Sequence, residues 1–159
     1  MSVVRVEFIN PFISAVTKTF EMMVNLKLTR SAPTLKNDRN TLYPVSGIIG
    51  FSGKIVGTVI LTMSEPVALK AASVMLMDEL KTVDDDVLDA IGELTNMIAG
   101  NAKAQLEEYN LSLSLPNAIF GAGTEVRFPE KSQPITIPFN SEFGPLAVEV
   151  GFGDPQDEK

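Results

Sequence analysis

The sequence predicts an α+β fold in which a mostly antiparallel sheet packs against long helices. Two segments, 11–25 and 84–109, carry apolar residues at the three- and four-residue spacing of an amphipathic helix. Segments 45–61 and 135–152 are rich in Val, Ile, Phe and Thr and are interrupted by turn-forming residues, which is typical of strands. With 159 residues, of which 45% are hydrophobic, the chain can build one core, so we expect a single domain.

The first elements are expected to be a helix followed by a hairpin. Asn10-Pro11 supplies a cap and a first-turn proline for a helix over 11–25. A β-like segment follows at 26–35. The apolar runs within 45–61 then predict a hairpin, for which Ser52-Gly53 is the expected turn.

Two further helices follow the hairpin. Ser64 is a suitable cap for the first of them, and Glu65 favours the positive end of its dipole. The run Asp84-Asp85-Asp86 opens the main helix, which should extend to about Tyr109. Asn110 is a plausible left-handed terminator of that helix.

The C-terminal part of the chain predicts three strands. Residues 111–115 alternate apolar and polar side chains, as in a half-buried strand, and lead into a Gly-rich turn. Residues 135–139 and 146–152 also fit strand chemistry. Pro138, together with Pro134, moves the first of these two toward an edge, a bulge or an exchanged position. The tail 154–159 is expected to fray.

The composition excludes several kinds of chemistry. The chain contains no His and no Cys, which removes His-dependent nucleophile systems, ordinary zinc sites, iron–sulfur clusters and disulfides. A net charge of −7, without a Lys/Arg-rich run, argues against nucleic acid or an anionic membrane surface as a partner. The start of the chain has no signal-peptide pattern, and no apolar stretch is long enough to span a bilayer. We therefore expect a cytoplasmic protein.

The main helix is predicted to have an apolar face and a presented polar face. At 100° per residue, the apolar face contains Val87, Ile91, Leu94 and Ile98. The opposite face contains Asp89, Glu93, Asn96 and Gly100. Asn is a poor helix former, and Gly is worse than Ala by about 1 kcal/mol. A contact made through the polar face would explain why both are there.

Other motifs have ordinary structural explanations. The Asp84-Asp85-Asp86 run lacks the converging loop oxygens that a hard cation needs, so we interpret it as a helix start. The glycines of the hairpin do not have phosphate-loop spacing. Asn101 and Lys103 could touch a partner, but a solvated face explains them equally well. The methionines interpreted as core filler are Met22, Met23, Met75, Met77 and Met97.

The residues around Glu93 and Asn96 resemble a known family. A Glu and an Asn three residues apart are common by chance, but here they stand in Glu93-Leu-Thr-Asn96-Met-Ile-Ala-Gly100, with Asp89 before and Leu115-Pro116 after. This text is similar to the CheX/CheC/FliY group of chemotaxis phosphatases, and it looks most like CheX. CheC-like members usually carry two such helices, whereas this chain has one. The resemblance implies a single CheC/CheX-like domain over residues 1–153.

The resemblance also implies an activity and roles for the polar face. The activity is hydrolysis of the aspartyl phosphate of a CheY-like response regulator. Glu93 is expected to pair with the regulator's active-site lysine, and Asn96 to reach the acyl phosphate and orient a water. Gly100 would permit close approach of the partner, or else accommodate an internal neighbour. Asp89 would join the partner-binding face, although a solvated helix carboxylate is its ordinary explanation.

The same resemblance implies the remaining components. No cofactor of the chain's own is expected, because Mg²⁺ belongs to the partner regulator. CheX-like proteins pair through their sheets, so we expect a homodimer in which the Pro-interrupted strand region is a reasonable place for exchange.

Two other interpretations stay open. One is a non-catalytic response-regulator-binding or dimerisation module on the same fold, against which the presence of both Glu93 and Asn96 counts. The other is a purely structural oligomerisation domain, which would leave the polar face unexplained. Substitution of Glu93 should weaken docking if the chain is a phosphatase or a regulator-binding module, and should have no effect if it is a purely structural domain.

Overall fold

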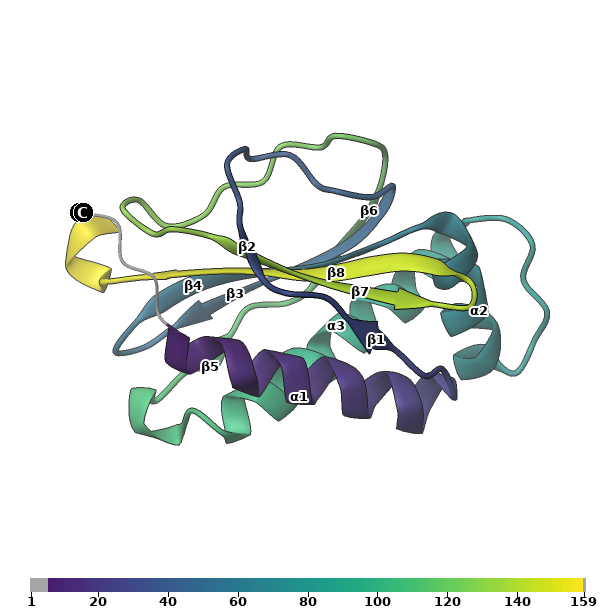
Figure 1. Ribbon diagram of the computed structural model, residues 1–159, viewed down its shortest axis with the longest axis horizontal. Helices are drawn as coiled ribbons and strands as arrows, with labels where there is room; N and C mark the ends of the chain where they lie inside the picture. The colour runs from purple at the N-terminus through teal and green to yellow at the C-terminus, as the bar shows by residue number, and fades with distance from the viewer. Residues whose placement is uncertain (1–5, 159) are drawn as a thin grey trace.

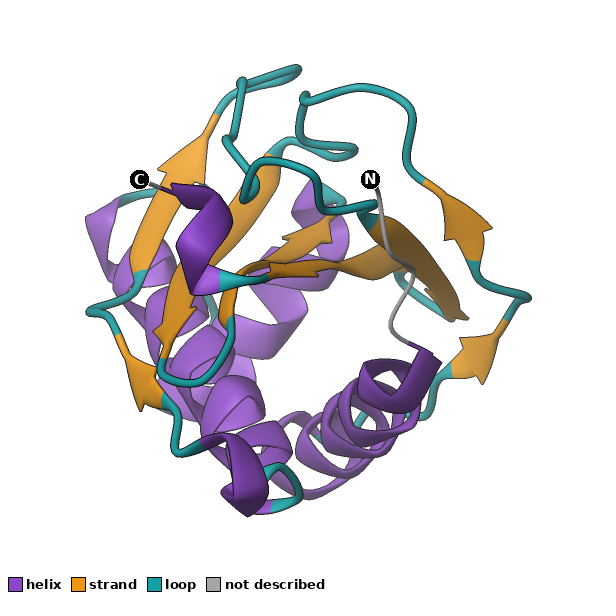
Figure 2. Cartoon of the chain, turned by 90° about the vertical axis from the view of Figure 1, so that its left-hand side faces the viewer, coloured by secondary structure: helices purple, strands orange, loops and turns teal. Residues whose placement is uncertain are grey.

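The computed structural model describes residues 6–158 and confirms the predicted α+β class. Three α-helices gather on one side of an antiparallel sheet, and long loops lie over its other side (Figures 1 and 2). The helices are α1 (Ile9–Thr19), α2 (Glu65–Leu76) and α3 (Asp85–Ala104). None of the helices in the described residues is both long and apolar enough to cross a membrane.

The sheet has the order β1-β7-β8-β4-β3-β5, with β2 also paired to β7 and β6 also paired to β3. Its last strand in sequence, β8, lies between β4 and β7 in the middle of the sheet. The strands are β1 (Thr29–Arg30), β2 (Thr34–Leu35), β3 (Val45–Ser52), β4 (Val56–Met63), β5 (Ser112–Leu113), β6 (Asn117–Phe120), β7 (Ile135–Ser141) and β8 (Gly144–Gly153).

The hairpin of β3 and β4 is confirmed, with its turn at residues 53–55. The predicted strand with Pro138 is β7, which lies one place in from the edge. Its outer partners are the two-residue strands β1 and β2, and Pro138 faces the gap between them. There its carbonyl accepts a hydrogen bond from Ser31 N at 3.0 Å. Because neither β1 nor β2 pairs with Pro138, its lack of an N–H donor does not break the ladder on that side.

The first helix is confirmed, but its predicted cap is wrong, because α1 begins at Ile9 with Phe8 at the N-cap and Asn10 inside the first turn. The main helix ends early. After α1 the chain continues as one π-helical turn, η2 (Phe20–Val24), and stops at Asn25 in the left-handed region. The main helix was expected to reach Tyr109, and this is wrong, because α3 ends at Ala104. Leu106 leaves helical geometry and is only 3% exposed, so the chain turns to bury it before the 3-10 turn η3 (Glu107–Tyr109). Asn110 terminates that turn with φ 52°.

Both ends of the described chain form short helical turns. A 3-10 turn, η1 (Val6–Phe8), precedes α1, and another, η4 (Pro155–Glu158), follows β8. In the second, Asp157 pairs with Lys131 at 3.3 Å on the surface. Whether the tail 154–159 frays in solution stays a prediction.

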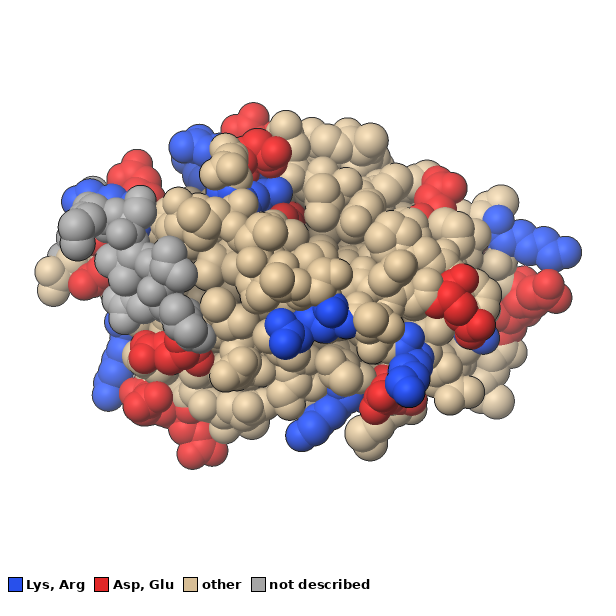
Figure 3. Space-filling model, viewed as in Figure 1, with Lys and Arg blue, Asp and Glu red and all other residues tan. Residues whose placement is uncertain are grey.

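Acidic and basic side chains are interspersed on the face shown in Figure 3, and an uncharged area lies above the basic side chains near its centre. Three methionines interpreted as core filler, Met22, Met23 and Met77, are also at the surface, so that interpretation is wrong for them. Met22 is 81% exposed at the end of the first helix, and Met77 is 93% exposed. Met77 caps α2 in the left-handed conformation, which points the chain away from the core.

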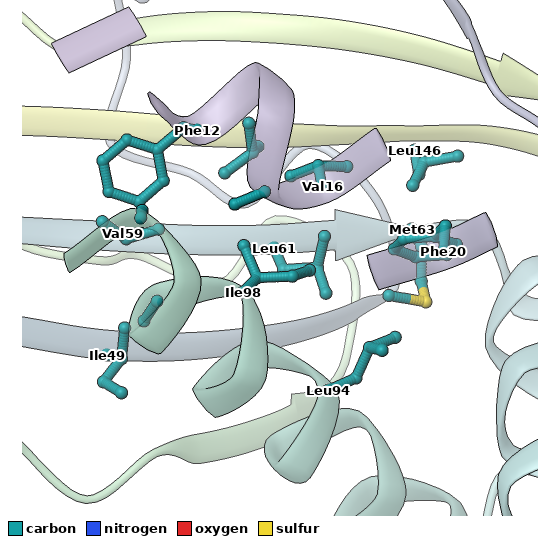
Figure 4. Packing of buried hydrophobic residues seen from close by; sticks show 14 of the residues in the cluster. Phe12, Val16, Phe20, Ile49, Val59, Leu61, Met63, Leu94, Ile98 and Leu146 are labelled. Carbon is teal, nitrogen blue, oxygen red and sulfur yellow. The ribbon is translucent and has the colours of Figure 1, made fainter. Parts of the chain in front are cut away.

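The core lies between the helices and the sheet (Figure 4). Phe12, Val16 and Phe20 of the first helix are fully buried. They belong to one cluster with Leu61 of β4 and Ile98 of α3. Burying such side chains stabilises the fold by roughly 1.5–3 kcal/mol each. The core face predicted for the main helix is confirmed, and its opposite face is left for other contacts.

Candidate functional site

The long helix α3 begins at a conventional cap. The carboxylate of Asp84 accepts a hydrogen bond from Val87 N at 3.0 Å, and Asp85 and Asp86 lie in the first turn. Carboxylates at this end complement the helix dipole. The interpretation of the acidic run as a helix start is therefore confirmed.

Close packing on β3 fixes the rotation of α3. Thr95 is 1% exposed, and its hydroxyl donates to Ile91 O at 2.7 Å within the helix. The threonine lies against Gly47 of β3, where a Cβ would overlap its hydroxyl. Because Leu94 and Thr95 are both buried, the residues that flank them, Glu93 and Asn96, are turned toward the opposite side.

The predicted polar face is present on α3. Glu93 and Asp89 are exposed, and Asn96 is half-buried beside them. Within residues 6–158, no protein group makes a hydrogen bond or ion pair with the side chain of Glu93 or Asn96. Both functional groups are therefore available to another molecule.

Gly100 lies one turn beyond Asn96 and has no packing reason to be glycine. A Cβ built on it would have no heavy atom of the described chain within 4 Å. The alternative that Gly100 accommodates an internal neighbour is thus not supported. Its place on the polar face leaves room for a partner's backbone.

A groove runs along the first half of this face, between α3 and the start of β6. It has a volume of about 540 Å³. Its residues are Asp85, Leu88, Asp89, Gly92, Glu93, Pro116, Asn117 and Ala118. We call it the acidic groove, because it contains three carboxylates and no basic residue. Gly92 faces β6, where a Cβ would make only an ordinary contact, 4.0 Å from that of Ala118.

A second hollow of about 650 Å³ lies at the other end of the face, with Asn96 between the two in sequence. It is more apolar than the acidic groove. Its residues are Gly100, Lys103, Ala104, Leu106, Glu107, Asn110, Leu111 and Leu113. Lys103 therefore borders a hollow beside the polar face.

Asn101 has a structural role that the sequence did not reveal. Its side-chain amide donates to Thr19 Oγ1 of α1 at 3.1 Å, and Thr19 is 2% exposed. Asn101 is exposed, as a solvated face predicts, and it also makes this contact within the chain. The contact ties α1 to α3 one turn after Asn96.

The edge of the sheet beside the acidic groove contains a β-bulge, which strand alternation did not predict. Phe51 of β3 pairs with Leu113, and Ile48 pairs with Asn117. Two residues of β3 therefore face three residues, 114–116. The expected half-buried strand over 111–115 is wrong at its end, because the bulge turns Leu115 outward, where it is 87% exposed.

Among residues 6–158, no three acidic side chains lie close enough together to hold one metal ion. The chemistry that the polar face itself offers is that of a carboxylate and an amide. Asn96 can donate and accept hydrogen bonds without adding charge, and Glu93 can pair with a cation.

Comparison with known families gives one match. The family model described as chemotaxis phosphatase CheX matches residues 45–140, which is more than half of the chain. This range contains β3, β4, α2, α3 and most of β7, and so includes the whole polar face of α3.

Individual relatives are similar over most of their length. The CheY-P phosphatase CheX of Thermotoga maritima is 27% identical over 122 residues, or 75% of this chain and 79% of that protein. The crystal structure of the chemotaxis protein CheX from Vibrio vulnificus is 31% identical, covers 93% of this chain and 100% of its own, and has a TM-score of 0.84. A CheX-CheY-BeF3-Mg²⁺ complex from Borrelia burgdorferi shares the fold at 23% identity, with coverage of 94% and 100% and a TM-score of 0.75.

Proposed function

Since the chain belongs to the CheX family of chemotaxis phosphatases, we propose that it hydrolyses the aspartyl phosphate of a CheY-like response regulator. In this proposal Glu93 docks to the regulator and Asn96 orients the attacking water. Asp89 and Gly100 complete the partner-binding face. The substrate class follows from the T. maritima relative, a CheY-P phosphatase.

The observation that carries the proposal is that the side chains of Glu93 and Asn96 are unpaired. They flank two buried residues on a helix that is locked to the sheet through Thr95 and Gly47. Their functional groups have no partner in the described chain. A rigid helix that presents an unpaired carboxylate and an unpaired amide can place both on a partner at fixed positions.

An amide at position 96 suits phosphoryl transfer to water. The transition state is loose and spreads negative charge over the phosphoryl oxygens, so catalysis depends on positioning and existing electrostatics. Asn96 can accept a hydrogen bond from the water and donate another without adding negative charge beside the phosphate. The water oxygen attacks phosphorus as the bond to the aspartyl oxygen breaks, which yields inorganic phosphate and a free aspartate.

Glu93 serves docking in this proposal. It stands one helical turn before Asn96, and a salt bridge from its carboxylate to the regulator's active-site lysine would fix where the amide lies. The acidic groove beside it favours a basic surface on the partner. Mg²⁺ is assigned to the regulator, and the chain is proposed to need no cofactor of its own.

A homodimer and a cytoplasmic location complete the proposal. The uncharged area above the centre of the face in Figure 3 provides a surface from which charged side chains, which oppose association, are largely absent. Exchange of a strand between the two copies is one way in which such a dimer can form. Light scattering or sedimentation of the purified protein measures the oligomeric state directly.

The activity is tested by phosphate release. A purified CheY-like regulator is phosphorylated with acetyl phosphate in the presence of Mg²⁺, and release is followed with wild type and with Asn96→Ala. We expect wild type to exceed spontaneous hydrolysis and Asn96→Ala to lose about a hundredfold or more, the scale of a misplaced catalytic group. Asn37→Ala, an exposed asparagine beyond β2, is the matched control and should behave as wild type.

A second candidate function is a non-catalytic regulator-binding module on the same fold. Free Glu93 and the acidic groove fit this alternative as well. Binding of the regulator without any release above the spontaneous rate would overturn the enzyme proposal and favour the module. Glu93→Ala should weaken binding in both cases. If it has no effect, neither function holds for this face.

A further inference from the structure

The bulge beside the acidic groove holds Leu115 in an unusual position. The alternation of 111–115 places Leu111, Leu113 and Leu115 on one face, and Leu111 is only 4% exposed. Leu115 departs from this pattern and is 87% exposed. It is the one leucine above 60% exposure among the described residues. Pairing between β3 and residues 113–117 without the extra residue would have kept Leu115 half-buried.

The residues on both sides hold the bulge rigidly. Ser114 is joined to Gly50 of β3 twice, because Ser114 N donates to Gly50 O at 2.9 Å and Gly50 N donates to Ser114 Oγ at 2.8 Å. On the other side, Pro116 has a fixed φ and also restricts the residue before it to extended conformations. Leu115 is therefore presented from a fixed backbone and loses little backbone entropy on binding.

The position of the bulge relates Leu115 to the proposed site. Pro116 and Asn117, which follow it directly, line the acidic groove across from Asp89 and Glu93. An exposed leucine thus stands at the border of a groove that contains carboxylates and no basic side chain. A partner that is complementary to this surface carries a cation for the groove and an apolar side chain next to it.

We propose that Leu115 is a docking anchor for the response regulator, in contact with an apolar side chain beside the regulator's active-site lysine. The inference rests on the proposed function, since it assigns a second contact point to the same partner. Glu93 then supplies the charged contact of the complex, and Leu115 an apolar contact that excludes water at its border. Two fixed points on different elements, α3 and the bulge, determine the orientation of the regulator over Asn96.

The test separates docking from catalysis. Phosphate release from the acetyl-phosphate-treated regulator with Mg²⁺ is measured over a range of regulator concentrations. We expect Leu115→Ala to raise KM about five- to tenfold and to leave kcat unchanged. The melting temperature should not change, because the side chain is exposed. Leu115→Met should restore most of the affinity, because it keeps an apolar side chain of similar size.

Leu35→Ala is the matched control. Leu35 is 55% exposed on β2, which pairs with β7 at the opposite edge of the sheet from β6. A KM for Leu115→Ala within twofold of that for Leu35→Ala would overturn the anchor. A fall in kcat or in melting temperature that accounts for the loss would also overturn it.

A direct measurement of binding tests the anchor separately from the activity. The Kd of the phosphorylated regulator is measured for Asn96→Ala and for Asn96→Ala combined with Leu115→Ala. If wild type binds without hydrolysis, the proposed activity fails, but a five- to tenfold rise in Kd in the double variant still supports the anchor. If wild type does not bind the regulator at all, the activity and the anchor both fail.

Discussion

Thr95 of α3 lies so close to Gly47 of β3 that a Cβ on the glycine would overlap the threonine hydroxyl. The same hydroxyl is already engaged with Ile91 O, so it cannot turn away without losing that hydrogen bond. Because Thr95 directly precedes Asn96, this contact determines the depth and rotation of the helix where the proposed catalytic amide is presented.

Gly47→Ala should therefore damage both stability and activity. The added methyl group must push α3 away from the sheet, and overpacking of this kind costs about 1–3 kcal/mol. Urea unfolding measures the loss, and phosphate release should fall even in the fraction that stays folded. Gly50→Ala in the same strand is the control, because its Cβ would meet Ser114 Oγ at an ordinary 3.5 Å. Equal effects of the two variants would contradict the prediction.

Gly100→Ala should stabilise the protein and weaken docking. No heavy atom of the described chain lies within 4 Å of the new Cβ, and alanine in place of a mid-helix glycine is worth about 0.5–1 kcal/mol. The urea midpoint is expected to rise while the Kd for the regulator increases. An unchanged Kd would remove Gly100 from the partner-binding face.

Asn96→Asp should reduce phosphate release at least as much as Asn96→Ala, although aspartate is nearly isosteric with asparagine. The new carboxylate adds negative charge beside the phosphoryl group and cannot donate a hydrogen bond when ionised. Single-turnover release at saturating concentration measures this step. Retention of more than a tenth of wild-type activity by Asn96→Asp would show that the amide is not required.

The stability of the fold should depend strongly on both partners of the buried ion pair between Lys36 and Glu149. Their side chains are 5% and 1% exposed, and Nζ lies 3.0 Å from Oε2. Glu149 also accepts a hydrogen bond from Thr136, while its other oxygen has no partner in the described chain. Replacing Glu149 by Gln leaves the buried Lys36 with only the exposed Asp38 and the carbonyl of Asn40 as partners, and should cost up to roughly 3–5 kcal/mol.

The double variant Lys36→Met, Glu149→Leu should recover most of that loss, since buried pairs are often replaced by apolar residues without penalty. Denaturant unfolding of the two single variants and the double variant forms the cycle. Additive losses in the double variant would show that the two side chains act independently.

Asp38 predicts a small stability change in acid. The N–H of Asn40 donates to its carboxylate at 3.0 Å, and Lys36 lies 3.3 Å away; these contacts lower the pKa of Asp38 from its ordinary value of 3.8. A lowered folded-state pKa gives stability that is present above the unfolded value and is lost as pH falls through the folded one. The side chain is 67% exposed, so solvent screens the effect.

We therefore expect Asp38→Asn to be slightly less stable than wild type at neutral pH. The two stability curves should converge below about pH 3.8. Unfolding in urea across this range measures the difference. A gap that stays constant into the acid would contradict a role for the ionised carboxylate.

Local periodicity predicted the parts of the fold that depend on local sequence. The hairpin of β3 and β4 and the two faces of α3 follow from the spacing of apolar residues, and the helix start follows from Asp84. The end of α3 did not, because burial of Leu106 overrides helix propensity there. The strand segments expected over 26–35 and 111–115 are present only as the two-residue strands β1, β2 and β5, whose bounds the pattern did not give.

The site was only partly predictable, because part of it depends on contacts between segments that are far apart in the sequence. Spacing places Glu93 and Asn96 on one helical face, and the text around them singles them out through its resemblance to the CheX/CheC/FliY group. The acidic groove and the bulge depend on pairing between β3 and residues far along the chain. A bulge changes strand phase by one residue, so alternation placed Leu115 on the wrong side.

The central position of β8 has a consequence for how the protein is made. During synthesis β4 emerges with one edge unpaired, and that edge is covered only when residues 146–153 have left the ribosome. Until then the nascent chain exposes a long apolar strand, which is a hazard for association with other chains. A chain that stops short of β8 would leave β7, with β1 and β2, unconnected to β4 and β3. Translation must therefore reach residues 146–153 before the two parts of the sheet join, whereas Gly47 of β3, against which Thr95 packs, is made much earlier.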